Sequence, residues 1–299
     1  MVKYIYITIY IYWRCFILRS LINSEILGDY AIQNGKTILT QKLDMEKTKK
    51  QPGVYEVIRV IDGVPLFLEK HVERFKRSAD LLGYSLKTSS GSEYLNSSIH
   101  SLVELNSCKN GNIKIIINNL NTAMQDNYFF FLKSSYPSLS QITDGVPTIL
   151  FSAKRSNPNA KSLNLPFREK VDEEILKTSS YEALLVDKNR YITEGSKSNV
   201  FFVKDKTLYT PPAYNVLPGI TRGAIIEICQ RLSIEVIEQN IHSSTLKDFD
   251  GLFITGTSPK VLPISSVDGM IFFSSKNTLI ITIKDAYDML INEYIQSRT

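Results

Sequence analysis

Apolar and polar positions alternate along short stretches of the first half of the chain, which predicts strands joined by tight turns. Two hairpins are expected there because apolar runs flank the turn pairs Asn34-Gly35 and Asp62-Gly63. Apolar residues then recur at helical spacing from Leu68 to Leu82, and Gly83 follows where a helix-ending glycine is favoured. The pattern further predicts a helix over 92–105 and a hairpin that pairs 113–117 with 128–132.

The second half has the same mixture of elements. Strands are predicted over 146–151, 183–186, 199–203 and 251–255. Helices are predicted around Phe167, Val171 and Ile175, after Gly219, and around the closing apolar residues Ala286, Met289, Leu290 and Ile295. Because strands come in hairpins with helices between the blocks, we expect an α+β chain and not a run of βαβ units.

A polar, proline-containing stretch at 134–140 is the best candidate for a linker. It divides the chain into an N-terminal domain over 30–133 and a larger C-terminal domain over 141–299. Residues 1–29 are interpreted as a disordered extension or a miscalled start, since alternating Ile and Tyr is what an AT repeat would encode. A membrane anchor is the alternative, but the apolar run is shorter than the roughly twenty residues that a spanning helix needs.

Composition and charge bear on three possible features of the protein: nucleic-acid binding, disulfide bonds and metal sites. The hydrophobic fraction of 43% and the charged fraction of 22% are ordinary for a globular protein, and the net charge of +5 is mild. The lysine run at 47–50 is interpreted as a solvated loop, so we expect no nucleic-acid partner. Three scattered cysteines argue against a disulfide framework and favour a reducing, cytoplasmic setting. The three histidines have no metal-ligand spacing, so no metal site is expected.

Lys161 and Glu194 are the first candidates for chemistry. Lys161 follows a strand-like run, and its small or apolar neighbours allow burial, which lowers a lysine's pKa and frees the amine to form an imine. Glu194 lies between two apolar strands, at the start of a polar loop. The pair suits a cofactor that needs a Schiff base at one end and a proton partner at the other. For either residue taken alone, solvent exposure is the ordinary alternative.

Two turns are candidate phosphate sites. Leu217-Pro218-Gly219 leads into a helix at Ile220 and Thr221, where free backbone N–H groups and the helix dipole favour an anion. The alternative is that Thr221 simply caps the helix. The turn after 251–255 presents Gly256 and Thr257 as a second candidate, with an ordinary turn as the alternative. Arg74 is a candidate for a charge-assisted contact, with a surface arginine such as Arg77 as the alternative.

The segments 193–201, 208–211 and 217–222, together with Ala160-Lys161-Ser162-Leu163-Asn164, Val54-Tyr55-Glu56-Val57 and the run 71–79, resemble the signature of the class IV aminotransferases. These are fold-type IV enzymes that use pyridoxal 5′-phosphate (PLP), and they include branched-chain and D-amino-acid aminotransferases and aminodeoxychorismate lyases. The resemblance runs from about residue 32 to the end of the chain, with its motifs in order.

The resemblance implies a two-domain enzyme, usually a homodimer, with the cofactor in the cleft between the domains. Lys161 would bind the cofactor aldehyde and move a proton between substrate and cofactor, while Glu194 would pair with the ring nitrogen. Leu217 would pack on the ring. The phosphate would be held by Arg74, Ile220, Thr221 and the Gly256-Thr257 turn.

Departures from the family pattern bear on the substrate. The Arg-x-His clamp of D-amino-acid aminotransferases is missing after 113–117, and Asn118-Asn119-Leu120-Asn121 stands there instead. The Arg-Gly-rich strand pair of the lyases is not evident in this sequence either. Tyr55 is expected to contact the substrate. An aminotransferase for branched-chain or other apolar L-amino acids, with 2-oxoglutarate as acceptor, is therefore expected by elimination. The alternatives are an aminodeoxychorismate lyase, a D-amino-acid aminotransferase and a ligand-binding relic without catalysis.

Overall fold

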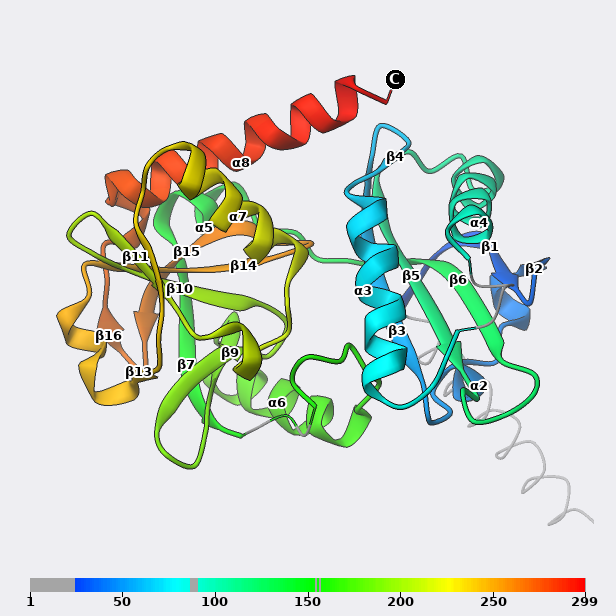
Figure 1. Cartoon of the computed structure of the whole chain (residues 1–299), viewed down its shortest axis with the longest axis horizontal. Helices are drawn as coiled ribbons and strands as arrows, with labels where there is room; N and C mark the ends of the chain where they lie inside the picture. Colours follow the sequence, from blue (N-terminus) through cyan, green and yellow to red (C-terminus); the bar gives the residue numbers. More distant parts are fainter. Residues whose placement is uncertain (1–24, 87–90, 154, 156, 299) are drawn as a thin grey trace, which may run out of the picture.

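The computed structural model describes residues 25–86, 91–153, 155 and 157–298, which form two lobes, each built on its own sheet (Figure 1). The smaller lobe holds a six-stranded sheet of order β2-β1-β6-β5-β3-β4 in which every neighbouring pair is antiparallel. Its strands are β1 (Ile26–Gln33), β2 (Lys36–Leu39), β3 (Val54–Ile61), β4 (Val64–Pro65), β5 (Gly111–Asn118) and β6 (Asp126–Leu132). Its helices are α2 (Met45–Thr48), α3 (Leu68–Leu81) and α4 (Ser92–Leu105).

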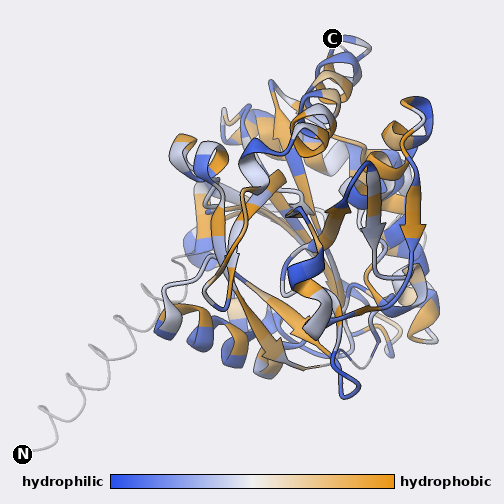
Figure 2. Ribbon diagram, turned by 90° about the vertical axis from the view of Figure 1, so that its left-hand side faces the viewer, coloured by the Kyte–Doolittle hydropathy of each residue, from blue (hydrophilic) through white to orange (hydrophobic). Residues whose placement is uncertain are grey.

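Alternation along β3 explains how this lobe packs. Val54, Ile58 and Val60 are buried in one core with Phe75 of α3, while Tyr55, Val57 and Arg59 face the other side of the sheet. Figure 2 shows the apolar colour gathered on the strands and on one side of the helices. Gly83 follows α3 with a φ of +81°, as the predicted helix-ending glycine requires.

The larger lobe holds a ten-stranded mixed sheet of order β12-β11-β10-β14-β15-β7-β8-β9-β13, with β16 paired to β15. The pairs β11–β12, β15–β7 and β7–β8 are parallel. Its strands are β7 (Val146–Ser152), β8 (Glu182–Val186), β9 (Tyr191–Gly195), β10 (Asn199–Lys204), β11 (Thr207–Thr210), β12 (Val236–Glu238), β13 (Ile241–His242), β14 (Gly251–Gly256), β15 (Lys260–Val267) and β16 (Met270–Ile271). Its helices are α5 (Leu139–Asp144), α6 (Leu165–Thr178), α7 (Ile220–Arg231) and α8 (Thr278–Gln296).

Three details differ from the sequence expectations. Strand β1 begins at Ile26, so the last residues of the expected extension 1–29 belong to the first sheet, and residues 1–24 lie outside the described part. Helix α5 begins at Leu139, inside the expected linker, because Ser138 and Gln141 form a capping box. Met289 was expected on the apolar face of the closing helix but is 62% exposed, since the buried face follows Ile280, Ile283, Tyr287, Ile291 and Tyr294. With these changes, we propose that the two sheets correspond to the two expected domains.

The segment between β7 and α6 reaches across to the smaller lobe and brings the two sheets together (Figure 1). The backbone N–H of Lys161 donates to the Ser78 hydroxyl at 3.1 Å, and its carbonyl accepts from the Tyr55 N–H at 3.1 Å. At the far end of the junction the Tyr294 hydroxyl of α8 donates to Glu69 at 2.7 Å. Lys161 is therefore held by β3 and α3 as well as by its own lobe. Within the described residues, none of the helices combines the length and apolarity that crossing a bilayer requires.

Candidate active site

Lys161 lies at the junction with its amine 4.8 Å from the centre of the Tyr55 ring. Burial lowers the pKa of Lys161, and the nearby guanidinium groups of Arg74 and Arg155 lower it further, although Tyr55 and Glu56 oppose the shift. A larger fraction of this amine is therefore uncharged near neutral pH than of an exposed lysine. This is the condition for nucleophilic attack on an aldehyde.

Tyr55 is the partner that the Lys161 charge affects most. The Lys161 ammonium group lowers the pKa of Tyr55 to about 8 against the opposing effect of burial, and Arg155 adds to the lowering. In the cofactor-free protein we expect one tyrosine to ionise near this pH, measured as the phenolate absorbance difference between wild type and Tyr55→Phe. Lys161→Met removes the leading cause, so the midpoint rises toward the usual value of 10. An unchanged midpoint would show that the two side chains are not coupled.

Glu194 is a buried carboxylate at the end of β9, with its side chain only 3% exposed. One oxygen accepts a hydrogen bond from the Leu217 N–H at 3.1 Å, and the other lies 3.1 Å from Nε of Arg155. Burial raises the pKa of Glu194, and the Arg155 charge and the Leu217 N–H oppose this. The Leu217 carbonyl in turn accepts from the Asn199 side chain at 2.9 Å. Glu194 and Leu217, both predicted from the sequence, are thus in direct contact.

Arg74 is buried on α3 and faces Glu56 of β3 in a two-point ion pair. Its Nε and Nη2 donate to the two Glu56 oxygens at 2.7 and 2.6 Å, and its Nη1 donates to the Pro218 carbonyl at 3.3 Å. Burial alone would raise the pKa of Glu56, but the Arg74 guanidinium outweighs it and holds the pKa below the usual carboxyl range. His71 Nδ1 lies 2.8 Å from the same carboxylate. Arg74 is therefore fixed at the turn that precedes α7, and it is not the surface arginine of the alternative reading.

The two predicted phosphate turns meet at one small cavity. Ile220, Thr221 and Thr257 all line a cavity of about 20 Å³, together with His71 and Tyr287. The N-cap of α7 is Gly219, so Thr221 lies one position inside the first turn and the reading of Thr221 as the cap is wrong. Its hydroxyl lies 3.3 Å from the Tyr287 hydroxyl, and Thr257 donates to the Val57 carbonyl at 3.3 Å. Gly256 is the last residue of β14, directly before Thr257.

Gly219 offers a sharp test of this cradle. A Cβ built on Gly219 would lie 2.0 Å from Oδ1 of Asn199, the side chain that fixes the Leu217 carbonyl. We expect Gly219→Ala to displace Asn199 and weaken cofactor binding about tenfold or more, because a hydrogen bond at the site is lost. Gly223→Ala is the matched control, since nothing lies within 4 Å of its Cβ. Cofactor titration of both variants is the measurement, and equal affinities would contradict the prediction.

Several residues at the site were not found from the sequence. Glu56 and His71 fix Arg74, while Arg155 contacts Glu194. A signal existed for Glu56, because β3 places this carboxylate on the same face as the apolar Val54 and Ile58. Arg155 gave no such signal, since it lies between strand β7 and the Lys161 turn in no periodic pattern. Among the described residues no group of three His, Cys, Asp or Glu side chains is arranged to hold a metal.

Taken together, the site offers a buried amine, a buried carboxylate and an anion cradle at a helix N-terminus, all at the junction of two lobes. These are the donor types that PLP needs: an amine for its aldehyde, an acid–base partner for its ring nitrogen, and N–H groups for its phosphate. The residues present fit that cofactor, and the fold and site define a PLP-dependent enzyme.

Comparison with known proteins defines the family. The family model for amino-transferase class IV matches residues 53–267. A probable branched-chain-amino-acid aminotransferase of Rickettsia typhi is 33% identical over 260 residues, which cover 82% of this chain and 86% of that protein. A D-alanine aminotransferase of Bacillus licheniformis is 29% identical over 227 residues, 73% of this chain and 79% of that protein. The crystal structure of the Escherichia coli branched-chain amino acid aminotransferase superposes with a TM-score of 0.78 at 25% identity, covering 89% of this chain and 95% of that one.

The chain therefore belongs to the class IV aminotransferase family. It is a transferase that uses PLP as cofactor, and its two-sheet architecture is that of fold type IV.

Proposed function

We propose that this enzyme transfers the amino group of a branched-chain or other apolar L-amino acid to a 2-oxo acid such as 2-oxoglutarate. The observation that carries the proposal is the placement of the Lys161 amine against the Tyr55 ring, close enough to Glu194 for the two charges to interact. An amine and an aromatic wall at one point suit an amino acid whose side chain is apolar. A relative matched over 260 residues carries a branched-chain name.

Each site residue is proposed to have one task. Arg74, the N–H groups of Ile220 and Thr221, and Thr257 would hold the phosphate, while Leu217 would pack against the ring. Glu194 would hold a proton at the ring nitrogen. The bound cofactor would supply the electron sink that makes the substrate Cα proton acidic. Lys161 would bind the aldehyde and carry the Cα proton, for which its lowered pKa is suited.

The loop after β5 supports the preference for L-amino acids. Asn118 donates to the Lys47 carbonyl at 2.6 Å, and Asn119 donates to Asp126 at 2.5 Å. Asn119 thus closes the loop between β5 and β6, and Asn118 ties the end of β5 to α2, in the segment where the resemblance places the carboxylate clamp of D-specific enzymes. The D-alanine aminotransferase relative keeps D-amino acids as the second candidate class.

A substrate panel tests the proposal. The purified enzyme, loaded with PLP, is offered L- and D-amino acids with 2-oxoglutarate or pyruvate as acceptor, and products are identified by chromatography. We expect glutamate from apolar L-amino acids and 2-oxoglutarate. Turnover of D-amino acids alone would favour the second candidate. Release of pyruvate from aminodeoxychorismate without an acceptor would favour a lyase and overturn the proposal.

We further propose a homodimer in the cytoplasm, as the family resemblance implies. Cys108 and Cys229 are both free, which agrees with a reducing compartment. Gel filtration with light scattering is the direct test of the dimer, and a monomer that retains full activity would contradict it.

A further inference from the structure

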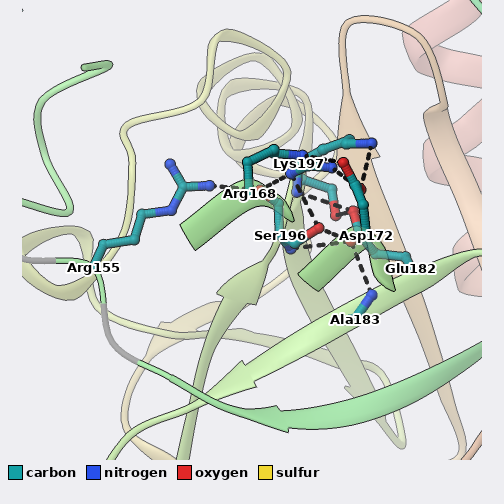
Figure 3. A network of polar contacts seen from close by, with 8 residues as sticks. Arg155, Arg168, Asp172, Glu182, Ala183, Ser196 and Lys197 are labelled. Atoms are coloured by element: carbon teal, nitrogen blue, oxygen red, sulfur yellow. Dashed lines mark hydrogen bonds and ion pairs between the residues drawn. The ribbon is translucent and has the colours of Figure 1, made fainter. Parts of the chain in front are cut away.

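Glu182 is a buried carboxylate that has no task in the proposed function. It is the first residue of β8 and is only 4% exposed. One of its oxygens accepts from the Ala183 N–H at 2.9 Å, from the Ser196 N–H at 3.1 Å and from the Ser196 hydroxyl at 2.5 Å. The other accepts from the Lys197 N–H at 3.1 Å and from the Ser198 hydroxyl at 2.9 Å. Four of these five donors belong to the loop that follows Glu194 (Figure 3).

No lysine, arginine or histidine of the described chain forms a direct ion pair with Glu182, so its nearest compensation is these five hydrogen-bond donors. Hydrogen bonds to an ionised acceptor are about twice as strong as neutral ones. The loop is also tightly packed at Gly195, because a side chain there would clash: a Cβ on Gly195 would lie 2.0 Å from the Ser198 hydroxyl oxygen. The Glu182 contacts therefore fix the direction of the two peptide units 195–196 and 196–197, whose N–H groups both donate to this carboxylate.

The Ser196 carbonyl is the part of this loop that faces the site. It accepts from Arg155 Nη2 at 2.6 Å and from Arg168 Nη1 at 3.0 Å. Figure 3 shows Arg155 reaching this loop from the side opposite to Glu182. Through its Nε, the same Arg155 guanidinium contacts Glu194 at 3.1 Å. A carbonyl whose direction is set by Glu182 thus holds the cation that faces the Glu194 carboxylate.

We propose that Glu182 is a positioning residue which, through the Ser196 carbonyl, holds Arg155 against Glu194 and so keeps Glu194 ionised toward the cofactor ring nitrogen. The inference rests on the proposed role of Glu194. Arg155 contacts the Glu194 carboxylate directly, so its charge lowers the pKa of Glu194 and favours the ionised carboxylate with the proton on the ring nitrogen. The Glu182 charge itself raises the pKa of Glu194, but by less than Arg155 lowers it, so the loss of the Arg155 contact is the larger of the two effects. Without the Arg155 contact, the proton shifts toward Glu194 and the ring carries less positive charge.

The test is the pH titration of the visible absorption band of the PLP-loaded enzyme. A ring with less positive charge lets the lysine–cofactor linkage hold its proton to higher pH. We therefore expect Glu182→Gln to raise the titration midpoint by about one pH unit, a tenfold change in proton affinity. The turnover number should fall while KM changes little, because an interaction of the transition state is weakened. Glutamine keeps the volume of Glu182 but turns one acceptor into a donor facing the Lys197 N–H.

Two controls separate positioning from loss of stability. Lys197→Ala removes an exposed side chain that pairs with Asp172 but leaves the N–H that Glu182 binds, so its midpoint should match wild type. Thr210→Val removes a buried hydrogen bond from Thr210 on β11 to the Val200 carbonyl on β10. It should lower the urea midpoint of unfolding without moving the spectral titration. A shift in either control would mean that the readout reports stability, and the inference would fall.

A double-mutant cycle with Arg155→Lys tests whether Glu182 acts on Glu194 through Arg155. Lysine has a single amine and cannot contact both the Ser196 carbonyl and Glu194 as the Arg155 guanidinium does. The Arg155→Lys variant should therefore raise the midpoint of the spectral pH titration, as Glu182→Gln does. If Glu182 acts through Arg155, the double variant should shift no further than Arg155→Lys alone. Additive shifts, or an unchanged midpoint in Glu182→Gln at full cofactor occupancy, would overturn the inference and leave the proposed function intact. Should Glu182→Gln not fold, Ser196→Ala removes one donor and should raise the midpoint by a smaller amount.

Wild-type protein without any visible band at saturating cofactor would instead overturn the proposed role of Lys161, and this inference with it. The two failures are therefore distinguishable from the wild-type spectrum alone.

Discussion

Lys161→Ala should abolish covalent attachment of the cofactor and lower the rate of amino transfer at least about 10⁴-fold, because both the attachment point and the proton carrier are lost. The measurement is glutamate formation under single-turnover conditions, with the visible spectrum recorded alongside. The fold should survive, since the hydrogen bonds that join Lys161 to Ser78 and Tyr55 are made by its backbone atoms, which the substitution leaves in place.

Lys70→Ala is the control for this variant. Lys70 lies at the same junction of the two lobes, but its side chain is partly exposed and, within the described residues, its ion-pair partner is Glu227 at 2.7 Å. Exposed pairs of this kind contribute about 0–1 kcal/mol, so activity and spectrum should match wild type. A visible band and turnover that persist in Lys161→Ala would assign the attachment to another lysine.

Arg74→Ala should give the largest loss of stability among the variants proposed. It leaves the buried Glu56 carboxylate with only His71 as a partner, and breaking such a pair costs about 3–5 kcal/mol of unfolding free energy. Cofactor affinity should fall about 10- to 100-fold as a charge-assisted phosphate contact is lost. Urea unfolding and cofactor titration are the two measurements. Arg77→Ala, an exposed arginine on the same helix, should change neither quantity.

The stability loss should depend on pH in a defined direction. Arg74 holds the pKa of Glu56 below its value in the unfolded chain, so unfolding takes up a proton at acid pH. This contribution is therefore fully present above the usual carboxyl pKa and is lost as pH falls through the lower folded pKa. Glu56→Gln in the Arg74→Ala background should recover part of the stability at neutral pH, because no buried charge is then unpaired. A double variant less stable than Arg74→Ala would contradict the ion-pair account.

How far the sequence predicts the site depends on how local the signal is. Lys161, Glu194 and the Gly219 turn stand in motifs that can be read along the chain, and the strands around them follow simple alternation. Arg155 and Glu182 could not be found in this way. Their partner Ser196 is separated from them by 41 and 14 residues, and it comes near only because β8 pairs with both β7 and β9.

The helix boundaries show the same limit. The helix over 92–105 was predicted with its observed ends, because its apolar face and its flanking glycine and asparagine are local. On α8, Ala286, Leu290 and Ile295 pack against the core as predicted, and only Met289 was misplaced, because the buried face is set by contact with α7 and β15. Met289 is apolar yet lies on the solvent side of that helix.

The most direct measurement of the central claim is the site of cofactor attachment in the wild-type enzyme. The PLP-loaded protein is reduced with borohydride and digested, and the modified peptide is identified by mass spectrometry. The account predicts a single phosphopyridoxyl adduct, on Lys161. An adduct on any other lysine, or none at saturating cofactor, would contradict it.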